Sequence, residues 1–214
     1  MRSLVALLAA SAVVAATVAA CEEEPKTSGL SPKGTRIAGG RPVAGEVVLP
    51  CRRRVEGAPG LPLRSRARDF AADGVILYGL EDEARRARKR PGAVARRYRD
   101  GFGMVKILAG VRAGLRARVA IGLKSRGLAG LLYGPSPDPQ HPRNRLDMSE
   151  RAVEFQACPR DEPRLSSGGT VGGLTHFAGG FLIVRAHCLR LRISVRGRAP
   201  RHYALAYGVP PERC

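Results

Sequence analysis

The segment Leu189-Arg190-Leu191-Arg192-Ile193-Ser194-Val195 alternates strictly between apolar and polar side chains. Successive side chains of a β-strand point to opposite faces of the sheet. The period of two therefore places Leu189, Leu191, Ile193 and Val195 on one face, and Arg190, Arg192 and Ser194 on the other. It predicts a strand with one face in a hydrophobic core and an arginine-bearing face toward solvent.

Similar short apolar or alternating runs recur along the last two thirds of the chain. Short apolar or alternating runs, bounded by Gly and Pro, cover 73–80, 104–123, 128–134, 152–158, 177–184 and 202–209, and 104–123 reads as two strands around a turn at 110–114. Such spacing is typical of antiparallel sandwiches. We expect a mainly β fold, an antiparallel β-sandwich of the Ig-like or a similar type.

One segment departs from this rhythm and predicts a helix. Residues 80–90 (LEDEARRARKR) have acids in the first turn and bases in the last, and Pro91 follows. This charge order complements the helix dipole, and Pro disfavours helix in the residue before it. We expect a single short, charged surface helix.

The first 20 residues carry an early Arg2 and then a run of small apolar side chains, which is the layout of a secretory signal peptide. The run ends in Val18-Ala19-Ala20-Cys21, which resembles the lipobox of bacterial lipoproteins. That resemblance implies that Cys21 receives diacylglycerol and becomes the mature N-terminus. In the alternative, a signal peptidase cleaves nearby and Cys21 has no role.

The Pro- and Gly-rich stretch that follows lacks a hydrophobic period, although EVVLPC at 46–51 has strand character. Segments of this composition bury too little apolar surface to offset their ordering entropy. We therefore expect a lipid-anchor cysteine with a flexible tether over 21–67, and one β-sandwich domain over 68–214.

Four further cysteines indicate two disulfides in an exported chain. Of the three possible pairings we expect Cys158 with Cys188 and Cys51 with Cys214, because the first closes a loop between two predicted strands and the second ties the tether to the last residue. Each bridge should stabilise the fold by roughly 2–4 kcal/mol.

The formal net charge of +19 suggests anionic partners. Outside the membrane, nucleic acid is scarce, and lipid headgroups and wall polymers are the anionic neighbours. We expect no nucleic-acid partner and consider binding of anionic lipid or wall polymer through an Arg-rich face. An excess of Arg, Ala, Gly and Pro is equally explained by a GC-rich genome.

Fragments of a serine-protease signature are present but lack the pattern that would unite them. Arg36–Gly40, Ser166–Gly169 and Arg185–Cys188 echo the processed N-terminus, the nucleophile loop and the histidine strand end, yet His187 follows Ser167 instead of preceding it. We expect a non-enzymatic protein. The alternative is a small secreted hydrolase with an unrecognised site in the 166–187 loop.

No cofactor or metal site is expected. The histidines show no ligand spacing, and Asp161 and Glu162 lie in a turn where nothing raises their pKa as acid catalysis would require; the histidines are His141, His176, His187 and His202. The glycine pairs near 168–173 are not followed by the Lys-Ser/Thr of a phosphate loop.

The C-terminal part resembles small exported actinobacterial lipoproteins and secreted proteins. The matching residues are Cys158-Pro159, Thr170-Val171-Gly172, Thr175 with Phe177-Ala178-Gly179-Gly180-Phe181, Cys188-Leu189 with Leu191, and Cys214. The resemblance implies an envelope location, a β fold and cysteine bridges, and it supplies no catalytic residue. Together these features predict a domain with a binding or scaffolding role at the bacterial cell surface.

Overall fold

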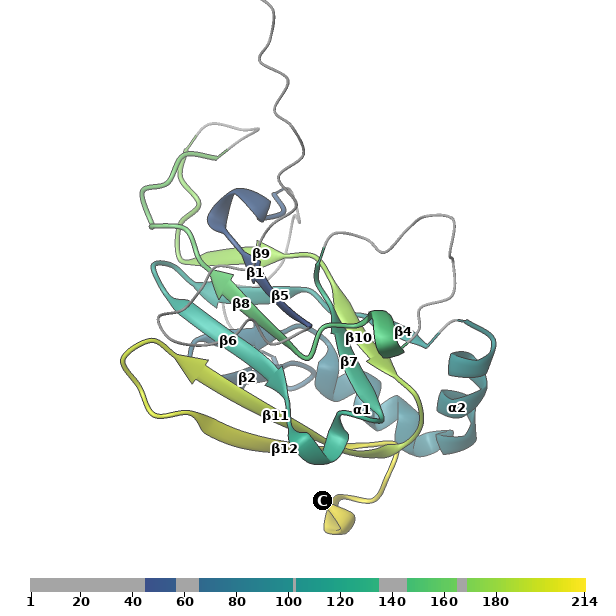
Figure 1. Ribbon diagram of the computed structural model, residues 1–214. Helices are drawn as coiled ribbons and strands as arrows, with labels where there is room; N and C mark the ends of the chain where they lie inside the picture. Colours follow the sequence, from purple (N-terminus) through teal and green to yellow (C-terminus); the bar gives the residue numbers. More distant parts are fainter. Residues whose placement is uncertain (1–44, 57–65, 102, 135–145, 165–168) are drawn as a thin grey trace, which may run out of the picture. The chain divides into compact units, whose positions relative to one another are not determined.

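The alternating segment forms β11 (His187–Val195), which is paired on both sides within a five-stranded sheet ordered β1-β8-β6-β11-β12. The other strands are β1 (Glu46–Leu49), β6 (Arg116–Ile121), β8 (Ala152–Gln156) and β12 (Arg201–Tyr207). All neighbours are antiparallel except β1 and β8, which are parallel. This computed structural model describes residues 45–56, 66–101, 103–134, 146–164 and 169–214 (Figure 1).

Two smaller sheets form the opposing layer. One has the order β2-β3-β5-β9 and the other β4-β10-β7. Their strands are β2 (Phe70–Ala72), β3 (Val75–Leu77), β4 (Met104–Lys106), β5 (Ala109–Arg112), β7 (Ala129–Leu132), β9 (Leu174–Phe177) and β10 (Gly180–Ile183). Because β4 runs into β5 and β9 runs into β10, the two sheets are joined by a bend. The predicted mainly β, sandwich-like fold is confirmed.

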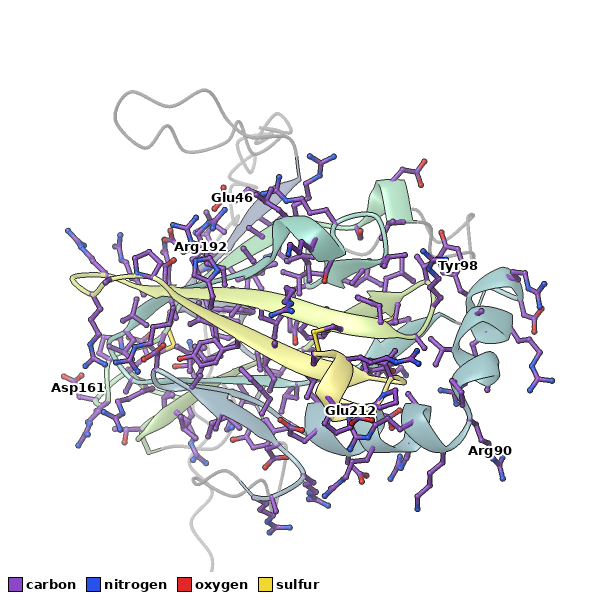
Figure 2. The ribbon with its side chains drawn as sticks, turned by 90° about the horizontal axis from the view of Figure 1, so that it is seen from below. Glu46, Arg90, Tyr98, Asp161, Arg192 and Glu212 are labelled. Carbon is purple, nitrogen blue, oxygen red and sulfur yellow. A yellow bond between two sulfur atoms is a disulfide. The ribbon has the colours of Figure 1, made fainter. Side chains whose placement is uncertain are left out.

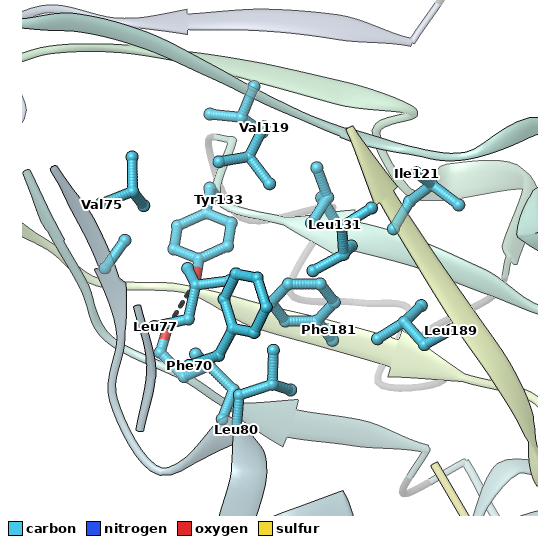
Figure 3. Close-up of a cluster of buried hydrophobic side chains, with 14 of the residues drawn as sticks. Phe70, Val75, Leu77, Leu80, Val119, Ile121, Leu131, Tyr133, Phe181 and Leu189 are labelled. Atoms are coloured by element: carbon cyan, nitrogen blue, oxygen red, sulfur yellow. Dashed lines mark hydrogen bonds between the residues drawn. The ribbon is translucent and has the colours of Figure 1, made fainter. Parts of the chain in front are cut away.

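Tyr133 lies at the centre of the core, among side chains from both layers (Figure 3). Its ring meets Phe155 and Phe181 edge to face, with centroids 5.2 and 6.5 Å apart, and its hydroxyl donates to the Ile107 carbonyl at 2.7 Å. A Cβ at Gly179 would overlap the Tyr133 ring. The backbone at Gly179 therefore approaches the ring of Tyr133 closely, which a larger residue would prevent.

Two helices follow β3, where the sequence predicted one. In α1 (Leu80–Lys89), the buried residues Leu80, Ala84 and Ala87 recur at helical spacing. They pack against β12. The missed helix is α2 (Pro91–Arg99), which has Pro at its first position and buries only Val94. Pro at a helix start is favourable, so Pro91 ends one helix and begins the next. Short 3-10 turns complete the structure: η1 (Cys51–Arg53), η2 (Leu123–Ser125), η3 (Leu146–Met148) and η4 (Pro211–Arg213).

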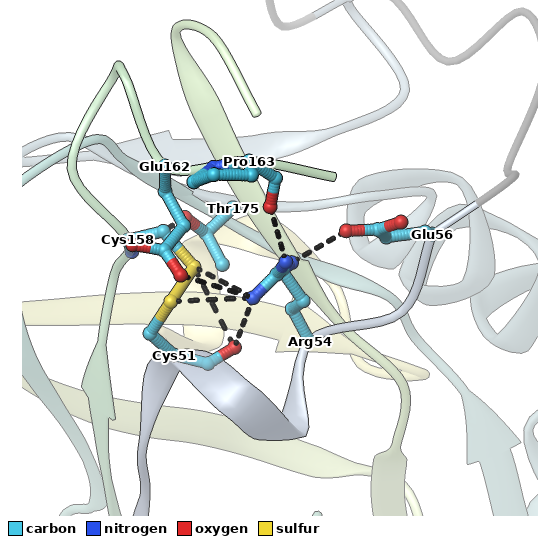
Figure 4. The surroundings of a disulfide bond; sticks show 7 residues. All are labelled: Cys51, Arg54, Glu56, Cys158, Glu162, Pro163 and Thr175. Atoms are coloured by element: carbon cyan, nitrogen blue, oxygen red, sulfur yellow. Dashed lines mark hydrogen bonds and ion pairs between the residues drawn. A yellow bond between two sulfur atoms is a disulfide. The ribbon is translucent and has the colours of Figure 1, made fainter. Parts of the chain in front are cut away.

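The folded part begins before residue 68, so the expected boundary of the tether is wrong. Strand β1 pairs along its length with β8, and Leu49 is buried. Beyond it, Arg54 is 8% exposed and is held by Glu56 at 2.6 Å and by the Pro163 carbonyl at 2.7 Å (Figure 4). The Pro and Gly content of the surrounding stretch led to the expectation of a tether, although β1 forms within it and pairs with a strand about 100 residues away.

The four cysteines form two disulfides as predicted, but the expected pairing is wrong. The bridges join Cys51 to Cys158 and Cys188 to Cys214. Parallel pairing of β1 with β8 places the residues after both strands side by side, which brings Cys51 to Cys158. Cys188 lies opposite Ala206 of β12, and the chain after β12 turns back to it through η4.

Replacing each pair of cysteines by serine should destabilise the domain by different amounts. The bridges close loops of 107 and 26 residues. Chain entropy then gives losses of about 4.8 kcal/mol for Cys51→Ser/Cys158→Ser and about 3.5 kcal/mol for Cys188→Ser/Cys214→Ser. Urea unfolding of both double variants measures the difference. Equal losses, or a larger loss for the second pair, would contradict this account.

Candidate functional site

A hollow of about 450 Å³ lies on the outer face of the five-stranded sheet, and we call it the outer hollow. It is formed by β6, β11, β12 and the turn η2. Its lining residues are Arg118, Ala120, Ile121, Gly122, Leu123, Lys124, Arg126, Arg190, Leu191, Arg192, His202, Tyr203 and Ala204. Five of these residues are Arg or Lys and none is Asp or Glu. The site is therefore strongly cationic.

The depth of the outer hollow comes from small side chains at outward positions. In the ladder, Ala120 lies opposite Arg192, and Ala204 lies opposite Arg190. Gly122 continues the row, and a Cβ there would press on the Cβ of Arg190. Cross-strand neighbours lie about 5 Å apart. A floor of Ala and Gly with a rim of long cationic side chains follows from the strand register.

Two of the five cations are already engaged. The Arg118 guanidinium pairs with Glu46 of β1, and the Arg190 guanidinium donates to the Cys214 carbonyl at 2.8 Å. Figure 2 shows Glu46 and Arg192 on neighbouring parts of this face.

The other three cations are not engaged: Lys124, Arg126 and Arg192 have no acidic partner in the part of the chain that the structure describes. All three are exposed. They are available to an incoming anion.

This arrangement suits carboxylate or phosphate groups. A guanidinium presents several N–H donors in a planar fork that matches such anions, and it stays charged at every physiological pH. Leu123, which is 77% exposed, adds one apolar contact at the rim. No group of three or more His, Cys, Asp or Glu side chains that could hold a metal ion occurs among the described residues.

The histidine of the protease-like fragment is a structural residue. His187 starts β11 on its inner face, is 8% exposed, and its Nδ1 lies 2.8 Å from the Arg185 carbonyl oxygen. Its Nε2 has no hydrogen-bond partner among the described residues. The expected 166–187 loop contains β9 and β10, while Ser166 and Ser167 lie outside the described residues.

The remaining histidines and carboxylates are dispersed. His176 of β9 lies beside Tyr78, with 3.3 Å between Nε2 and the hydroxyl, and burial lowers the pKa of its ring. His202 belongs to the outer hollow, and Glu162 lies 3.9 Å from Arg54. His141 falls outside the described residues. Among the described residues, His176, His202 and Glu162 are not brought together into an acid–base pair.

Glu150 is a half-buried carboxylate that sequence reasoning did not single out. Its oxygens accept the backbone N–H groups of Tyr133 and Gly134 at 3.3 and 3.1 Å. Burial raises the pKa of this carboxyl, and the backbone hydrogen bonds oppose the rise. Glu150 therefore binds the two backbone N–H groups that directly follow β7.

Comparison with known proteins adds no assignment. No protein-family model matches the chain, and a search of curated proteins found no match. The lipidation residue Cys21 lies outside the described residues. None of the described helices is long and apolar enough to cross a bilayer.

His187 should make the fold sensitive to acid. Burial, with the charge of Arg185, lowers the pKa of its ring below 6.5, so the unfolded chain takes up the proton first. The free energy of unfolding should therefore fall as the pH drops below 6.5. Urea unfolding at pH 7 and pH 5 should show a smaller fall for His187→Phe than for the unchanged chain, and an equal fall would contradict this.

Proposed function

We propose that this protein is a non-enzymatic, extracytoplasmic binding domain that holds an anionic polymer of the bacterial cell surface in its outer hollow. The main observation behind this proposal is the convergence of five cations on a hollow whose described lining residues include no carboxylate. Such a field attracts polyanions over a distance set by ionic strength. The two disulfides are compatible with a location outside the cytoplasm.

A polymer fits this site better than a small anion. The cations come from three separate elements, with Arg118 on β6, Arg190 and Arg192 on β11, and Lys124 and Arg126 in or after η2. The hollow is open and floored by small side chains, so charges repeated along a chain could contact several cations at once. Each cation near an anionic surface contributes about 1 kcal/mol.

Binding should depend on the free cations of the hollow and on salt. In the chain from Glu22 onward, Arg126→Gln/Arg192→Gln removes two cations that have no acidic partner among the described residues. At about 1 kcal/mol each, affinity for a polyglycerol-phosphate polymer should fall about thirtyfold. Fluorescence anisotropy with a labelled polymer, at low and high ionic strength, measures both effects.

The matched control is Arg52→Gln/Arg53→Gln, which removes the same charge from exposed positions of η1, away from the hollow. It should bind nearly as well as the unchanged chain. An equal loss in both double variants would show that total charge matters and the hollow does not. Affinity that is independent of salt would contradict the proposal altogether.

The proposal includes a lipid anchor at Cys21, which is supported by the resemblance of 18–21 to a lipobox. Two acyl chains give a stable attachment to a bilayer, whereas one chain gives only a reversible one. The β domain would then act at the membrane surface, near wall polymers. The resemblance to exported actinobacterial lipoproteins supports the same location.

Mass spectrometry of the mature protein tests the anchor. A chain that begins at Cys21 and carries a diacylglycerol mass is expected, and Cys21→Ser should abolish that mass and release the protein from the membrane fraction. A mature N-terminus elsewhere, without lipid, would contradict the anchor but leave the binding site intact.

A further inference from the structure

A second hollow, which we call the helix crevice, lies between α1, α2 and the strands beneath them. It measures about 460 Å³. Its lining residues are Glu83, Arg86, Ala87, Lys89, Arg90, Ala93, Val94, Arg97, Gly103, Val105, Ile183 and Tyr207. The crevice shares no residue with the outer hollow. Figure 2 shows Arg90 well separated from Arg192, so the two sites are independent.

The inner wall of the helix crevice is apolar. Ala87 of α1 and Val94 of α2 are both 8% exposed, and Ile183 of β10 is 1% exposed. Ala93 and Val105 extend this wall and are half-buried. Each methylene of a ligand that leaves water against such a wall gains about 0.8 kcal/mol. The wall therefore suits an alkyl chain.

Tyr207 supplies a polar group at the edge of this wall. The residue is 3% exposed, yet its hydroxyl makes no hydrogen bond within the described ranges. Burial raises the pKa of Tyr207 to about 12, with Glu83 raising it further and Arg97 opposing the rise. The hydroxyl thus lies near charges of both helices and keeps its proton. Tyr207 lines the crevice, where its hydroxyl can donate a hydrogen bond to an acceptor on a ligand.

The rim of the helix crevice is cationic. Arg86 is engaged with Asp82 at 2.7 Å and with Glu83 at 2.8 Å, so Glu83, the one carboxylate among the described lining residues, is already paired. Lys89, Arg90 and Arg97 are exposed, and no ion pair of theirs is found in the described part of the chain. An anionic headgroup would meet three available cations and one neutral hydroxyl donor.

We propose that the helix crevice binds a single-chain anionic amphiphile, with its alkyl chain against Val94 and Ile183 and its headgroup held by Tyr207 and Arg97. Neither a simple anion nor an uncharged alkane uses both parts of the crevice. The shared chemistry is an anionic headgroup on one alkyl chain, which either a free fatty acid or a membrane lipid can present.

Calorimetric titration of the chain from Glu22 onward tests this, with decanoate, decanol and inorganic phosphate as separate probes below micellar concentrations. Decanoate should bind. Decanol, which lacks the anionic headgroup, and inorganic phosphate, which lacks the alkyl chain, should each bind at least about tenfold more weakly. Phosphate that binds as well as decanoate would reduce the crevice to an anion site and overturn the proposal.

Variants locate the ligand. Tyr207→Phe should weaken decanoate binding about tenfold or more, because a hydrogen bond to a charged group is lost. Ala93→Asp, at a half-buried wall position, should weaken it further by opposing the headgroup and wetting the wall. Arg52→Gln, at an exposed position of η1 outside the lining of both hollows, is the control and should leave decanoate binding unchanged. Unchanged affinity in both crevice variants would overturn the proposal.

Vesicles distinguish the two sources of the amphiphile. If the chain binds vesicles that contain phosphatidylglycerol and decanoate competes, a membrane lipid is the ligand. If decanoate binds while vesicles do not, a free amphiphile is the ligand. Vesicle binding that is insensitive to decanoate, with no binding of decanoate alone, would assign the cations to a bilayer surface and overturn the crevice site.

Discussion

The register of β11 against β6 and β12 is the constraint on which the rest of the structure depends. It aligns Leu191 with Ile121 and Tyr203 on the inner face, and Arg192 with Ala120 and His202 on the outer face. A slip of one residue would move every side chain of β11 to the other face and bury two arginines. Because an unpaired buried charge costs several kcal/mol, the same alternation that specifies the core also fixes the arginines in the outer hollow.

The two disulfides secure the margins of this sheet. Strand β1 has four residues and a single neighbour, β8, so its pairing alone is weak. The Cys51–Cys158 bridge holds the end of β1, and the buried Arg54 satisfies carbonyl and carboxylate oxygens beside it. At the opposite edge, Cys188–Cys214 holds the chain that follows β12, and Arg190 donates to the Cys214 carbonyl. The position of Arg190 in the outer hollow thus depends on the Cys188–Cys214 disulfide.

Local patterns were sufficient to predict most of the strands and α1, because alternation, charge order and turn residues are properties of neighbouring positions. They missed β2 and most of β9, and the segment 104–123 holds three strands where two were expected. What could not be predicted depends on partners far along the chain. The disulfide pairing follows from a parallel contact between 46–49 and 152–155, and no local signal specifies it. Helix α2 buries one side chain and shows no apolar period. The arginines of β11 were recognised as outward-facing, but the floor made by Ala120, Gly122 and Ala204 required the register.

Composition explains how many arginines the chain has, but not where acids and small residues lie among them. The described part of the chain holds carboxylates beside many basic groups: Asp82 and Glu83 pair with arginines of α1, Glu56 pairs with Arg54, and Asp73 pairs with Arg201. In the outer hollow, Glu46 pairs with Arg118 from outside the lining, while Lys124, Arg126 and Arg192 remain without an acid. Their mutual repulsion disfavours the folded state and is relieved when an anion binds. A genome-wide bias would raise the numbers of Arg, Ala and Gly, but it would not set the strand register that brings Ala120 opposite Arg192 and Ala204 opposite Arg190. That register, and not the net charge, gives the outer hollow its shape.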